Sequence, residues 1–390
     1  AGAVRGAGAG EAHGPGGALT VGRESEVVPV SERVGVLVER RTLELARRGR
    51  PTHERLHLYR DITLRGGPEL VLFSLGDADF RERRVHGFVP TRRGWRRKEV
   101  ELPAVIHKRV LFPLPVERAL KRLAKKRHVL FVNPPLMSDK ARMHRVLMRW
   151  PAVADYLPLT EWYDGDELDR RLDNGATLIL KPRIGSVGKG VARVKPAGGR
   201  VAFTNEHGSR TFSRRGLREF LCRRAGSRTY LLQQYIPLAR FGGKPFDLRV
   251  PVQRGGDGRW VVAGVVAKVA VRHPFLTNLA QGGRAMPAEK ALAAAFSPAR
   301  AAEILDGVQQ LAVAVGEAVA ARFPDAADLG LDVGVDRRGK PWLIEVNARD
   351  QRITFLEAGM NDVLRAVYEH PVNYCAYAVS QRRPPARQTH

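Results

Sequence analysis

The sequence predicts an α+β protein, in which a small N-terminal α/β unit precedes a larger unit of hairpins and helices. Two patterns carry this prediction. In residues 28–135, short apolar runs alternate with amphipathic helical spacing, as in sheets covered by helices. From residue 136 onward, glycine-rich turns separate apolar strands, which is typical of antiparallel pairs. The 390 residues are enough for two or three packed units.

Strands and helices alternate along the N-terminal unit. The segment VGVLVERRTLELARRG, from Val34, predicts a strand followed by an amphipathic helix. Further elements are predicted in this order: strands at 69–75 and 104–110, a helix with a basic face at 116–127 and a buried strand at 128–133. Asn133-Pro134-Pro135 interrupts the pattern and ends the unit. Residues 1–27, rich in glycine and alanine, are expected to form a disordered tail.

The second unit covers residues 136–380, with a central part at 136–232 and a C-terminal part at 233–380. Ser138 or Asp139 is expected to cap its first helix, KARMHRVLMRW. The other expected elements are strands at 177–182, 190–196 and 229–236, a helix at 213–224, a strand pair of 246–254 with 260–271, a helix at 297–323 and a hairpin at 330–347 that turns near 337–339. Residues 381–390 are expected to form a flexible tail.

The strongly basic composition favours anionic ligands or surfaces. The formal net charge is +26. The basic residues are 13 lysines and 53 arginines, a bias that GC-rich coding alone can produce. The stretch 81–98 interleaves eight Arg or Lys residues with Phe88 and Trp95, which suits contact with a nucleic-acid backbone and stacking on bases. An exposed loop of the N-terminal unit is the alternative interpretation.

Composition and missing motifs exclude several classes. Cys222 and Cys375 are too few for a disulfide framework and lack metal-site spacing, so we expect a reducing, cytoplasmic type of compartment. The first residues lack the apolar segment of a secretory signal. No run of about 18 apolar residues predicts a membrane span. The motifs GxSxG, HRD and DFG are absent from the sequence.

A glycine-rich loop follows Lys181-Pro182 and lies between two predicted strands. Its members are Gly185, Ser186, Val187, Gly188, Lys189 and Gly190. Glycines let backbone N–H groups crowd an anion, and Lys181 adds a charge suited to phosphate. The order of residues matches neither a Walker A loop nor a dinucleotide-binding motif. This pattern alone does not decide between two interpretations of the segment, a phosphate-binding loop and a plain hairpin turn.

Three polar residues of the C-terminal hairpin suit a magnesium ion. Asp332 lies on the first strand, while Glu345 and Asn347, two residues apart, share one face of the second. Mg²⁺ prefers hard oxygen ligands and shares its coordination shell with phosphates. Glu345 interrupts an apolar run, so we expect it to be partly buried and to need a cation or donors. The alternative is a hairpin with a polar, exposed face.

Further charges are predicted on neighbouring elements. Asp247 and Arg249 share a strand face, where Arg249 suits a phosphoryl group or a carboxylate, and could equally pair with Asp247. Lys268 and Arg272 add positive charge on the next strand. Lys140 begins a helix, where the dipole disfavours a cation and an anionic ligand would relieve the conflict. A solvated lysine is the alternative.

Taken in order, these segments resemble the ATP-grasp superfamily. The matching run is NPPLMSDK, LILKPRIGSVGKGV, YLLQQYI, FDLRV, TNLAQGG and GLDVGVDRRGKPWLIEVN, which covers roughly residues 133–350. Within the superfamily the chain is similar to the YheC/YheD type, described as endospore coat-associated, and VGVLVE and PAVIHKRV in the N-terminal unit share this resemblance. The resemblance implies an ATP-grasp fold, two α/β subdomains gripping ATP, after a small α/β domain.

The resemblance also implies roles for single residues. Lys140 and Lys181 would contact ATP phosphates, with Lys181 also near the adenine, and the 185–190 loop would close over the β- and γ-phosphates. Arg249 would stabilise the transferred phosphoryl group. The implied catalytic set is Arg249, Lys181, Asp247 and Lys268. The implied adenine hinge, formed largely by backbone, is Gln233, Gln234, Tyr235 and Ile236. The implied ligands of one or two Mg²⁺ or Mn²⁺ ions are Asp332, Glu345 and Asn347. Many relatives carry Glu where Gln234 stands.

The implied reaction is the ATP-dependent joining of a carboxylate to an amine, through an acylphosphate. The substrates would be small molecules or peptides, and the basic surface suits acidic ones. Many relatives in the superfamily pair, so a homodimer is an expectation. Two other functions compete with this one: a nucleotide-binding spore-coat or envelope assembly protein without turnover, and a basic polyanion-binding protein.

Overall fold

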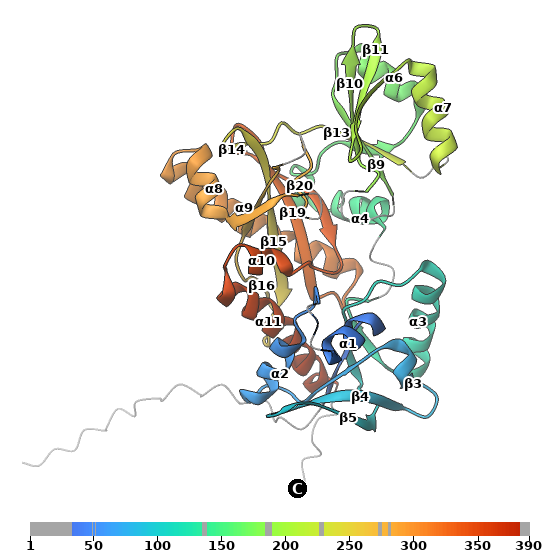
Figure 1. The fold of residues 1–390 in the computed structure, drawn as a ribbon, viewed down its shortest axis with the longest axis vertical. Coiled ribbons are helices and arrows are strands. Elements are labelled where there is room, and N and C mark those ends of the chain that lie inside the picture. Colours follow the sequence, from blue (N-terminus) through green and yellow to red (C-terminus); the bar gives the residue numbers. More distant parts are fainter. Residues whose placement is uncertain are drawn as a thin grey trace, which may run out of the picture.

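The chain is described by a computed structural model. The structure describes residues 33–48, 50, 52–134, 139–183, 189–225, 230–271, 275–279 and 282–382. Over these residues, three sheets follow one another along the long axis of the molecule (Figure 1). The predicted tail at 1–27, most of the predicted tail at 381–390 and the candidate cap Ser138 lie outside the described residues.

The N-terminal sheet is mixed, with parallel strands at its centre. Its strand order is β3-β4-β2-β1-β6-β7, and β5 pairs with β4. The strands are β1 Val34–Leu37, β2 Leu70–Phe73, β3 Ala78–Asp79, β4 Arg84–Thr91, β5 Gly94–Glu101, β6 Val105–Lys108 and β7 Leu130–Val132. The helices are α1 Arg40–Arg47, α2 Leu56–Leu64 and α3 Leu114–Arg127. Two separate apolar clusters lie on its faces, which is why β1, β2 and β6 are buried throughout, although β6 ends in His107 and Lys108.

The basic stretch 81–98 is a β-hairpin, which corrects the interpretation as an exposed loop. Strands β4 and β5 pair from Arg84 with Glu101 to Thr91 with Gly94. Phe88 and Trp95 are partly buried against an apolar cluster of the N-terminal unit. Because both rings are partly buried, only part of each is left for contact with bases, and polyanion binding by this hairpin stays a prediction.

The second sheet forms a separate lobe at one end of the molecule (Figure 1). It is antiparallel, in the order β12-β11-β10-β9-β13-β8. Its strands are β8 Thr160–Trp162, β9 Leu178–Pro182, β10 Ala192–Ala197, β11 Arg200–Asn205, β12 Gly208–Phe212 and β13 Tyr230–Gln234. Helices α6 Gly165–Asp173 and α7 Arg214–Ala225 supply leucines to its core. Two helices, α4 Lys140–Leu147 and α5 Pro151–Ala154, precede this lobe in the chain.

The third sheet is antiparallel and lies at the centre of the molecule. Its order is β18-β17-β15-β19-β20, and β14 and β16 also pair with β15. The strands are β14 Arg240–Phe241, β15 Lys244–Arg254, β16 Trp260–Val262, β17 Val266–Val269, β18 Arg284–Pro287, β19 Asp328–Val335 and β20 Pro341–Asn347. The helices are α8 Ala288–Ala295, α9 Pro298–Arg322, α10 Ile353–Glu357 and α11 Asn361–Ser380. The largest apolar cluster lies between this sheet and α8, α9, α4 and α5.

The predicted strand 260–271 is two strands, β16 and β17, that pair with different parts of β15. The break lies near Gly264. A Cβ on Gly264 would stand 2.7 Å from a methyl group of Val363 in α11, so the chain approaches that helix where only glycine fits. The single-strand prediction was wrong because the apolar pattern alone does not show this contact.

Among the described residues, α9 is the one helix long and apolar enough to cross a membrane by length and composition. Its N-terminus follows the predicted signal, because Ser297 accepts a hydrogen bond from the Arg300 N–H and Pro298 occupies the first turn. The buried face of α9, which includes Ile304, Val308 and Leu311, packs in the largest apolar cluster. In this fold α9 is therefore a core helix.

A buried polar network joins the N-terminal unit to the third sheet. Arg109, directly after β6, pairs with Glu54 at 3.1 Å and with Asp328 of β19 at 2.9 Å. Arg352 contacts the same two carboxylates, at 3.3 and 2.8 Å. Helix α11 packs against α2, β6 and β15 beside this network. The two units therefore share one continuous interior.

Candidate active site

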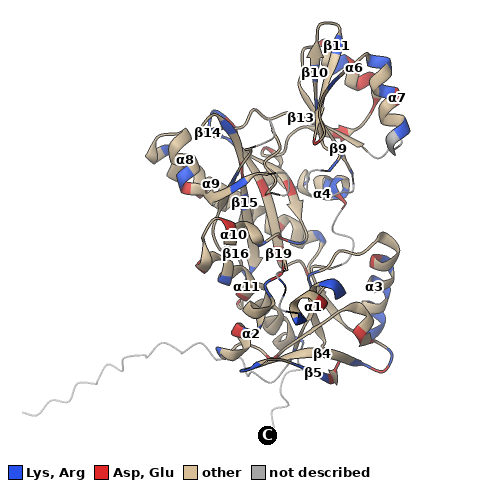
Figure 2. Ribbon diagram, viewed as in Figure 1, with Lys and Arg blue, Asp and Glu red and all other residues tan. Residues whose placement is uncertain are grey.

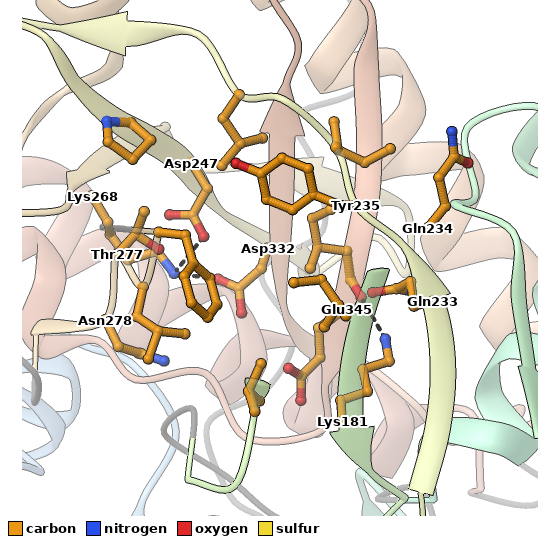
Figure 3. A pocket seen from close by; sticks show the side chains of 18 of the residues that line it. Lys181, Gln233, Gln234, Tyr235, Asp247, Lys268, Thr277, Asn278, Asp332 and Glu345 are labelled. Atoms are coloured by element: carbon orange, nitrogen blue, oxygen red, sulfur yellow. Dashed lines mark hydrogen bonds and ion pairs between the residues drawn. The ribbon is translucent and has the colours of Figure 1, made fainter. Parts of the chain in front are cut away.

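An open cleft lies between the second and third sheets. It encloses about 1030 Å³ of space, counting its mouth. Its apolar lining includes Ile179, Val191, Ile236, Leu238, Leu276 and Ile344. Its acids and lysines come from α4, β9, β15, β17, β19 and β20, and Figure 3 shows Lys181, Asp247, Lys268, Asp332 and Glu345 among them. Apolar and charged groups in one cleft suit a ligand with a flat apolar group and an anionic tail.

The structure brings the three predicted metal ligands together. Asp332 and Glu345 are direct cross-strand partners on β19 and β20, where an irregularity in the pairing follows Asp332. The Asn347 amide donates a hydrogen bond of 3.1 Å to Asp332 Oδ2. The Asp332 side chain is 13% exposed and that of Glu345 is 27% exposed, so a ligand in the cleft can reach both. Figure 3 shows the two carboxylates between Lys268 and Lys181.

Two cations of the third sheet neutralise Asp332. Lys268 Nζ lies 2.6 Å from Asp332 Oδ1 and 3.3 Å from Asp247 Oδ2, and Arg249 Nη2 lies 3.4 Å from Asp332 Oδ1. Burial favours the protonated form of Asp332, but Arg249 and Lys268 outweigh it and hold the pKa of Asp332 below its ordinary value. Burial raises the pKa of Asp247, and Lys268 only partly opposes this.

The alternative ion pair of Asp247 with Arg249 is replaced by other partners. Asp247 pairs with Lys268, its neighbour across β15 and β17. Arg249 lies between two carboxylates, Asp332 at 3.4 Å and Asp350 at 3.6 Å. Adjacent strands supply these partners, while the shared strand face keeps Asp247 and Arg249 side by side. Arg272 lies outside the described residues.

The donor set fits a metal that is bound together with phosphates. Among the described residues, no three or more His, Cys, Asp and Glu side chains form a metal cage. Asp332 and Glu345 instead offer two carboxylates on one wall of an open cleft, and the Asn347 amide is hydrogen-bonded to Asp332. Mg²⁺ is usually held in this way, by one or two carboxylates with water and substrate phosphates completing the shell.

Lysines line the cleft beside Glu345. Lys140 Nζ lies 3.4 Å from Glu345 Oε1, and Lys181 Nζ donates a 3.4 Å hydrogen bond to the Ile344 carbonyl. Burial lowers the pKa of Lys181 to about 8, with Lys140 adding to the shift and Glu345 opposing it. Lys181 therefore lies where an anion would relieve unfavourable electrostatics, whereas Lys140 already has a carboxylate partner in Glu345, and an anionic ligand of Lys140 stays a prediction.

The start of α4 explains how Lys140 reaches the cleft. Asp139 caps the helix, accepting hydrogen bonds from the N–H groups of Ala141 and Arg142 at 3.1 and 3.2 Å. The Asp139 carboxylate also accepts a hydrogen bond of 3.0 Å from Arg183, which follows β9. The cap therefore ties the first turn of α4 to the strand that carries Lys181.

Only the end of the glycine-rich loop is described. Gly185, Ser186, Val187 and Gly188 lie outside the described residues, while Lys189 is exposed and lines the cleft. Gly190 has a φ of 75°, in the left-handed region that favours glycine, and its N–H donates to Glu206 Oε1 at 2.9 Å. The loop thus returns to the sheet at the rim of the cleft.

The predicted adenine hinge lies at the end of β13. Gln233, Gln234, Tyr235 and Ile236 all line the cleft. The buried Gln233 amide donates to Thr160 at 2.8 Å. Gln234 is exposed, and its amide oxygen accepts from the Leu159 N–H at 3.3 Å, so this side chain is engaged with the edge of β8 (Figure 3). A backbone role for this segment is compatible with that geometry.

Comparison with known proteins decides the family. The sequence profile described as YheC/D-like ATP-grasp matches residues 128–378, well over half of the chain. The chain belongs to the YheC/D-like ATP-grasp family. This result confirms the predicted fold class and the resemblance, and proteins with this fold typically are ATP-dependent ligases that bind ATP with Mg²⁺.

Relatives and a solved structure agree with this family. Endospore coat-associated protein YheD of Bacillus subtilis is 25% identical over 368 residues, covering 90% of this chain and 79% of YheD. Endospore coat-associated protein YheC of the same organism is 23% identical over 301 residues, covering 74% and 81%. The structure of D-cycloserine synthetase DcsG aligns with a TM-score of 0.50 at 12% identity, covering 86% of this chain and 98% of DcsG. That similarity concerns the fold.

In this member of the YheC/D-like ATP-grasp family, the sequence did not predict two residues near the site, Asp350 and Arg193. Asp350 is buried, and no hydrogen bond to its carboxylate oxygens is found among the described residues, although Arg249 stands 3.6 Å away. Burial raises the pKa of Asp350 to about 6. Arg193 of β10 stacks over the rings of Tyr235 and Phe275, at 5.8 and 5.2 Å, near the cleft mouth. Neither residue belongs to a recognisable motif, so its neighbours appear only in the folded chain.

Proposed function

We propose that the protein is an ATP- and Mg²⁺-dependent ligase that activates a carboxylate as an acylphosphate and transfers the acyl group to an amine. One observation carries the proposal. Asp332 and Glu345 line the same cleft as Lys140 and Lys181, and Asn347 donates a hydrogen bond to Asp332. A hard-cation site and two phosphate-suited lysines within one cleft match a nucleoside triphosphate with its metal.

The roles follow from position. Lys140, Lys181 and Lys189 would bind phosphate oxygens, and the apolar lining near Ile236 would hold the base. Asp332, Glu345 and Asn347 would hold Mg²⁺, which neutralises charge on the β- and γ-phosphates when it is bound. Arg249, anchored between Asp332 and Asp350, would face the transferred phosphoryl group. Lys268 and Asp247 would keep the local charge balanced.

The proposed reaction has two displacement steps. A substrate carboxylate oxygen bonds to the γ-phosphorus while the bond from that phosphorus to the β,γ-bridging oxygen breaks, which releases ADP. The amine nitrogen then bonds to the acyl carbon, the carbon–oxygen bond to phosphate breaks, and the amine loses a proton. The protein contributes positioning and preorganised positive charge, from Lys181 and Arg249 in particular.

The first test is calorimetric titration with a non-hydrolysable ATP analogue and Mg²⁺. The wild type is expected to bind saturably, and Glu345→Gln to bind at least about tenfold more weakly, because a carboxylate ligand is lost. Glu317→Gln is a matched control, since Glu317 is exposed on α9 outside the cleft. No binding by folded wild-type protein, or equal binding by the Glu345 variant, would refute the proposed nucleotide site.

The names of YheD and YheC favour a second candidate, a nucleotide-binding protein of spore-coat or envelope assembly that does not turn over. We propose a cytoplasmic location for the protein, and association with the spore would fit this second candidate. ADP release during incubation with ATP, Mg²⁺ and mixtures of carboxylates and amines separates the two. Release that requires both substrates and is lost in Glu345→Gln supports the ligase, whereas tight binding without release across broad mixtures supports the assembly role.

A further inference from the structure

The outer face of α3 carries a positive stripe that the proposed reaction does not use. Leu114, Arg118, Lys121 and Lys125 recur at i, i+4, i+7 and i+11, so they lie on one side of the helix, and all four are exposed. Arg122 and Lys126 are also exposed and widen this stripe. Figure 2 shows Lys and Arg along α3, in the N-terminal unit. None of these residues lines the cleft.

The stripe has no acidic counterpart on its own helix. Glu117 is the acid of α3, and it is buried and paired with Lys108 at 3.0 Å. Within the described residues, no carboxylate forms an ion pair with the exposed cations of the stripe: Arg118, Lys121, Arg122, Lys125 and Lys126. The positive charge is therefore free to meet an external anion.

The helix dipole accounts for only part of this charge. Cations in the last turn, such as Lys125 and Lys126, stabilise the negative C-terminal end of a helix. Arg118 lies in the first half of α3, where the dipole gives it no such support. Its exposed, unpaired position therefore needs another explanation than helix stability.

An apolar tip adjoins the stripe. Leu111 and Leu114, at the entry to α3, are 42% and 45% exposed. Val116, Leu120 and Leu123 of the helix instead pack in the apolar cluster on this side of the sheet. The entry to α3 thus presents leucines to solvent beside a row of cations, a combination that suits the boundary between lipid headgroups and acyl chains.

We propose that Leu111 and the exposed face of α3 form a peripheral docking surface for an anionic lipid bilayer. Each cation close to such a surface contributes about 1 kcal/mol, and the leucines add apolar burial at the headgroup boundary. Lipid is favoured over nucleic acid because leucines gain nothing from a phosphodiester backbone. The rings of Phe88, Trp95 and Phe112 are partly buried in the apolar clusters of the N-terminal unit, which limits their surface for stacking.

Co-sedimentation with lipid vesicles tests this surface. The full chain is incubated with vesicles of phosphatidylcholine alone, or mixed with phosphatidylglycerol, at several salt concentrations. We expect binding to the anionic vesicles only, weakening as salt rises. The triple variant Arg118→Glu/Lys121→Glu/Lys125→Glu should lose about tenfold or more in affinity. Leu111→Ser/Leu114→Ser should weaken binding while keeping its salt dependence.

A second triple variant provides the matched control. Arg92→Glu/Arg93→Glu/Arg96→Glu makes the same change in net charge on exposed residues of the β4–β5 hairpin. We expect it to bind within about twofold of wild type, with all variants first checked for an unchanged melting temperature. Equal losses in both triple variants would show attraction by net charge alone and overturn the proposal. Absence of wild-type binding to anionic vesicles would also overturn the proposal. So would a DNA duplex that binds the protein as tightly as the vesicles do and loses affinity in the same α3 variants.

Discussion

At the scale of single residues, Lys181 shows how the fold prepares a site for an anion. Among the described residues its ammonium group donates one hydrogen bond of 3.4 Å, to a backbone carbonyl, and feels opposite electrostatic effects from Glu345 and Lys140. Burial lowers its pKa to about 8, so the protonated form is disfavoured in the ligand-free protein. A bound phosphate would supply the missing counter-charge and restore the pKa toward its ordinary value.

This reasoning predicts proton uptake when nucleotide binds. Near pH 8 the free protein holds Lys181 partly deprotonated, and binding of the ATP analogue should draw in roughly half a proton. Calorimetry in buffers with different ionisation enthalpies measures that uptake. At pH 6, where Lys181 is already protonated, its contribution should vanish.

Lys181→Met provides the check. The variant should lose this pH-dependent uptake and bind the analogue about tenfold to a hundredfold more weakly, as expected for a charged hydrogen bond. Lys189→Met, at the exposed rim of the cleft, should retain the uptake. Uptake that persists in Lys181→Met would assign the proton to another group.

At the scale of elements, the cap of α4 couples local stability to the site. Asp139 holds the first turn of the helix and contacts Arg183, and the next residue is Lys140. Helix α6 has the same kind of cap in Asp164, which accepts from the N–H groups of Asp166 and Glu167 at 2.9 and 3.0 Å. Asp164 does not line the cleft. Comparing variants of the two caps therefore separates an effect on helix stability from an effect on nucleotide binding.

We predict that Asp139→Ala and Asp164→Ala each cost about 1 kcal/mol of stability, the usual price of a lost N-cap. Only Asp139→Ala should also weaken binding of the ATP analogue, by several-fold, because it frees the turn that positions Lys140. Chemical denaturation gives the stabilities and calorimetry gives the affinities. Equal affinities in both variants would show that the cap does not position Lys140.

At the scale of the whole molecule, the buried network at Arg109 joins the N-terminal unit to the sheet that holds the site. Burial opposes ionisation of Glu54, but Arg109 and Arg352 outweigh it and lower the pKa of Glu54 to about 2. Arg352 and Arg109 likewise hold the pKa of Asp328 far below its ordinary value, against the effect of burial. From Asp350, whose carbonyl accepts from Arg109 at 2.9 Å, the contacts continue to Arg249.

The network predicts cooperative loss of structure in acid. A carboxylate with a depressed folded-state pKa contributes stability above its unfolded pKa, which for Glu54 is about 4.5, and loses that contribution as the pH falls toward 2. Fluorescence and circular dichroism should therefore report one acid transition for both units. Two separate transitions would contradict a shared interior.

Arg109→Met should destabilise the protein by about 3–5 kcal/mol and raise the midpoint of acid unfolding, because it leaves buried carboxylates without their cation. The double variant Glu54→Gln/Arg109→Met should recover part of that loss, since one of the stranded charges is removed. Denaturant titrations of the wild type and the single and double variants measure this coupling. Strictly additive losses would show that the pair does not act together.

Much of the fold was determined by local patterns in the sequence. Continuous apolar runs predicted β1 and β2, the Ser297-Pro298 signal predicted the start of α9, and the two-residue spacing placed Glu345 and Asn347 on one face of β20. Such features depend on side-chain periodicity and capping, which act over a few residues. The motif order likewise pointed to the ATP-grasp fold before any contact was known.

The tertiary structure decided what depends on neighbours from distant segments. The sequence left Arg249 open between an anionic ligand and an ion pair with Asp247, whereas the fold pairs Asp247 with Lys268 and sets Arg249 between Asp332 and Asp350. The fold also partly buried the rings of Phe88 and Trp95 and split the predicted strand near Gly264. Burial and charge pairing come from strands far apart in the chain, so only the folded molecule fixes which partner each charged group meets.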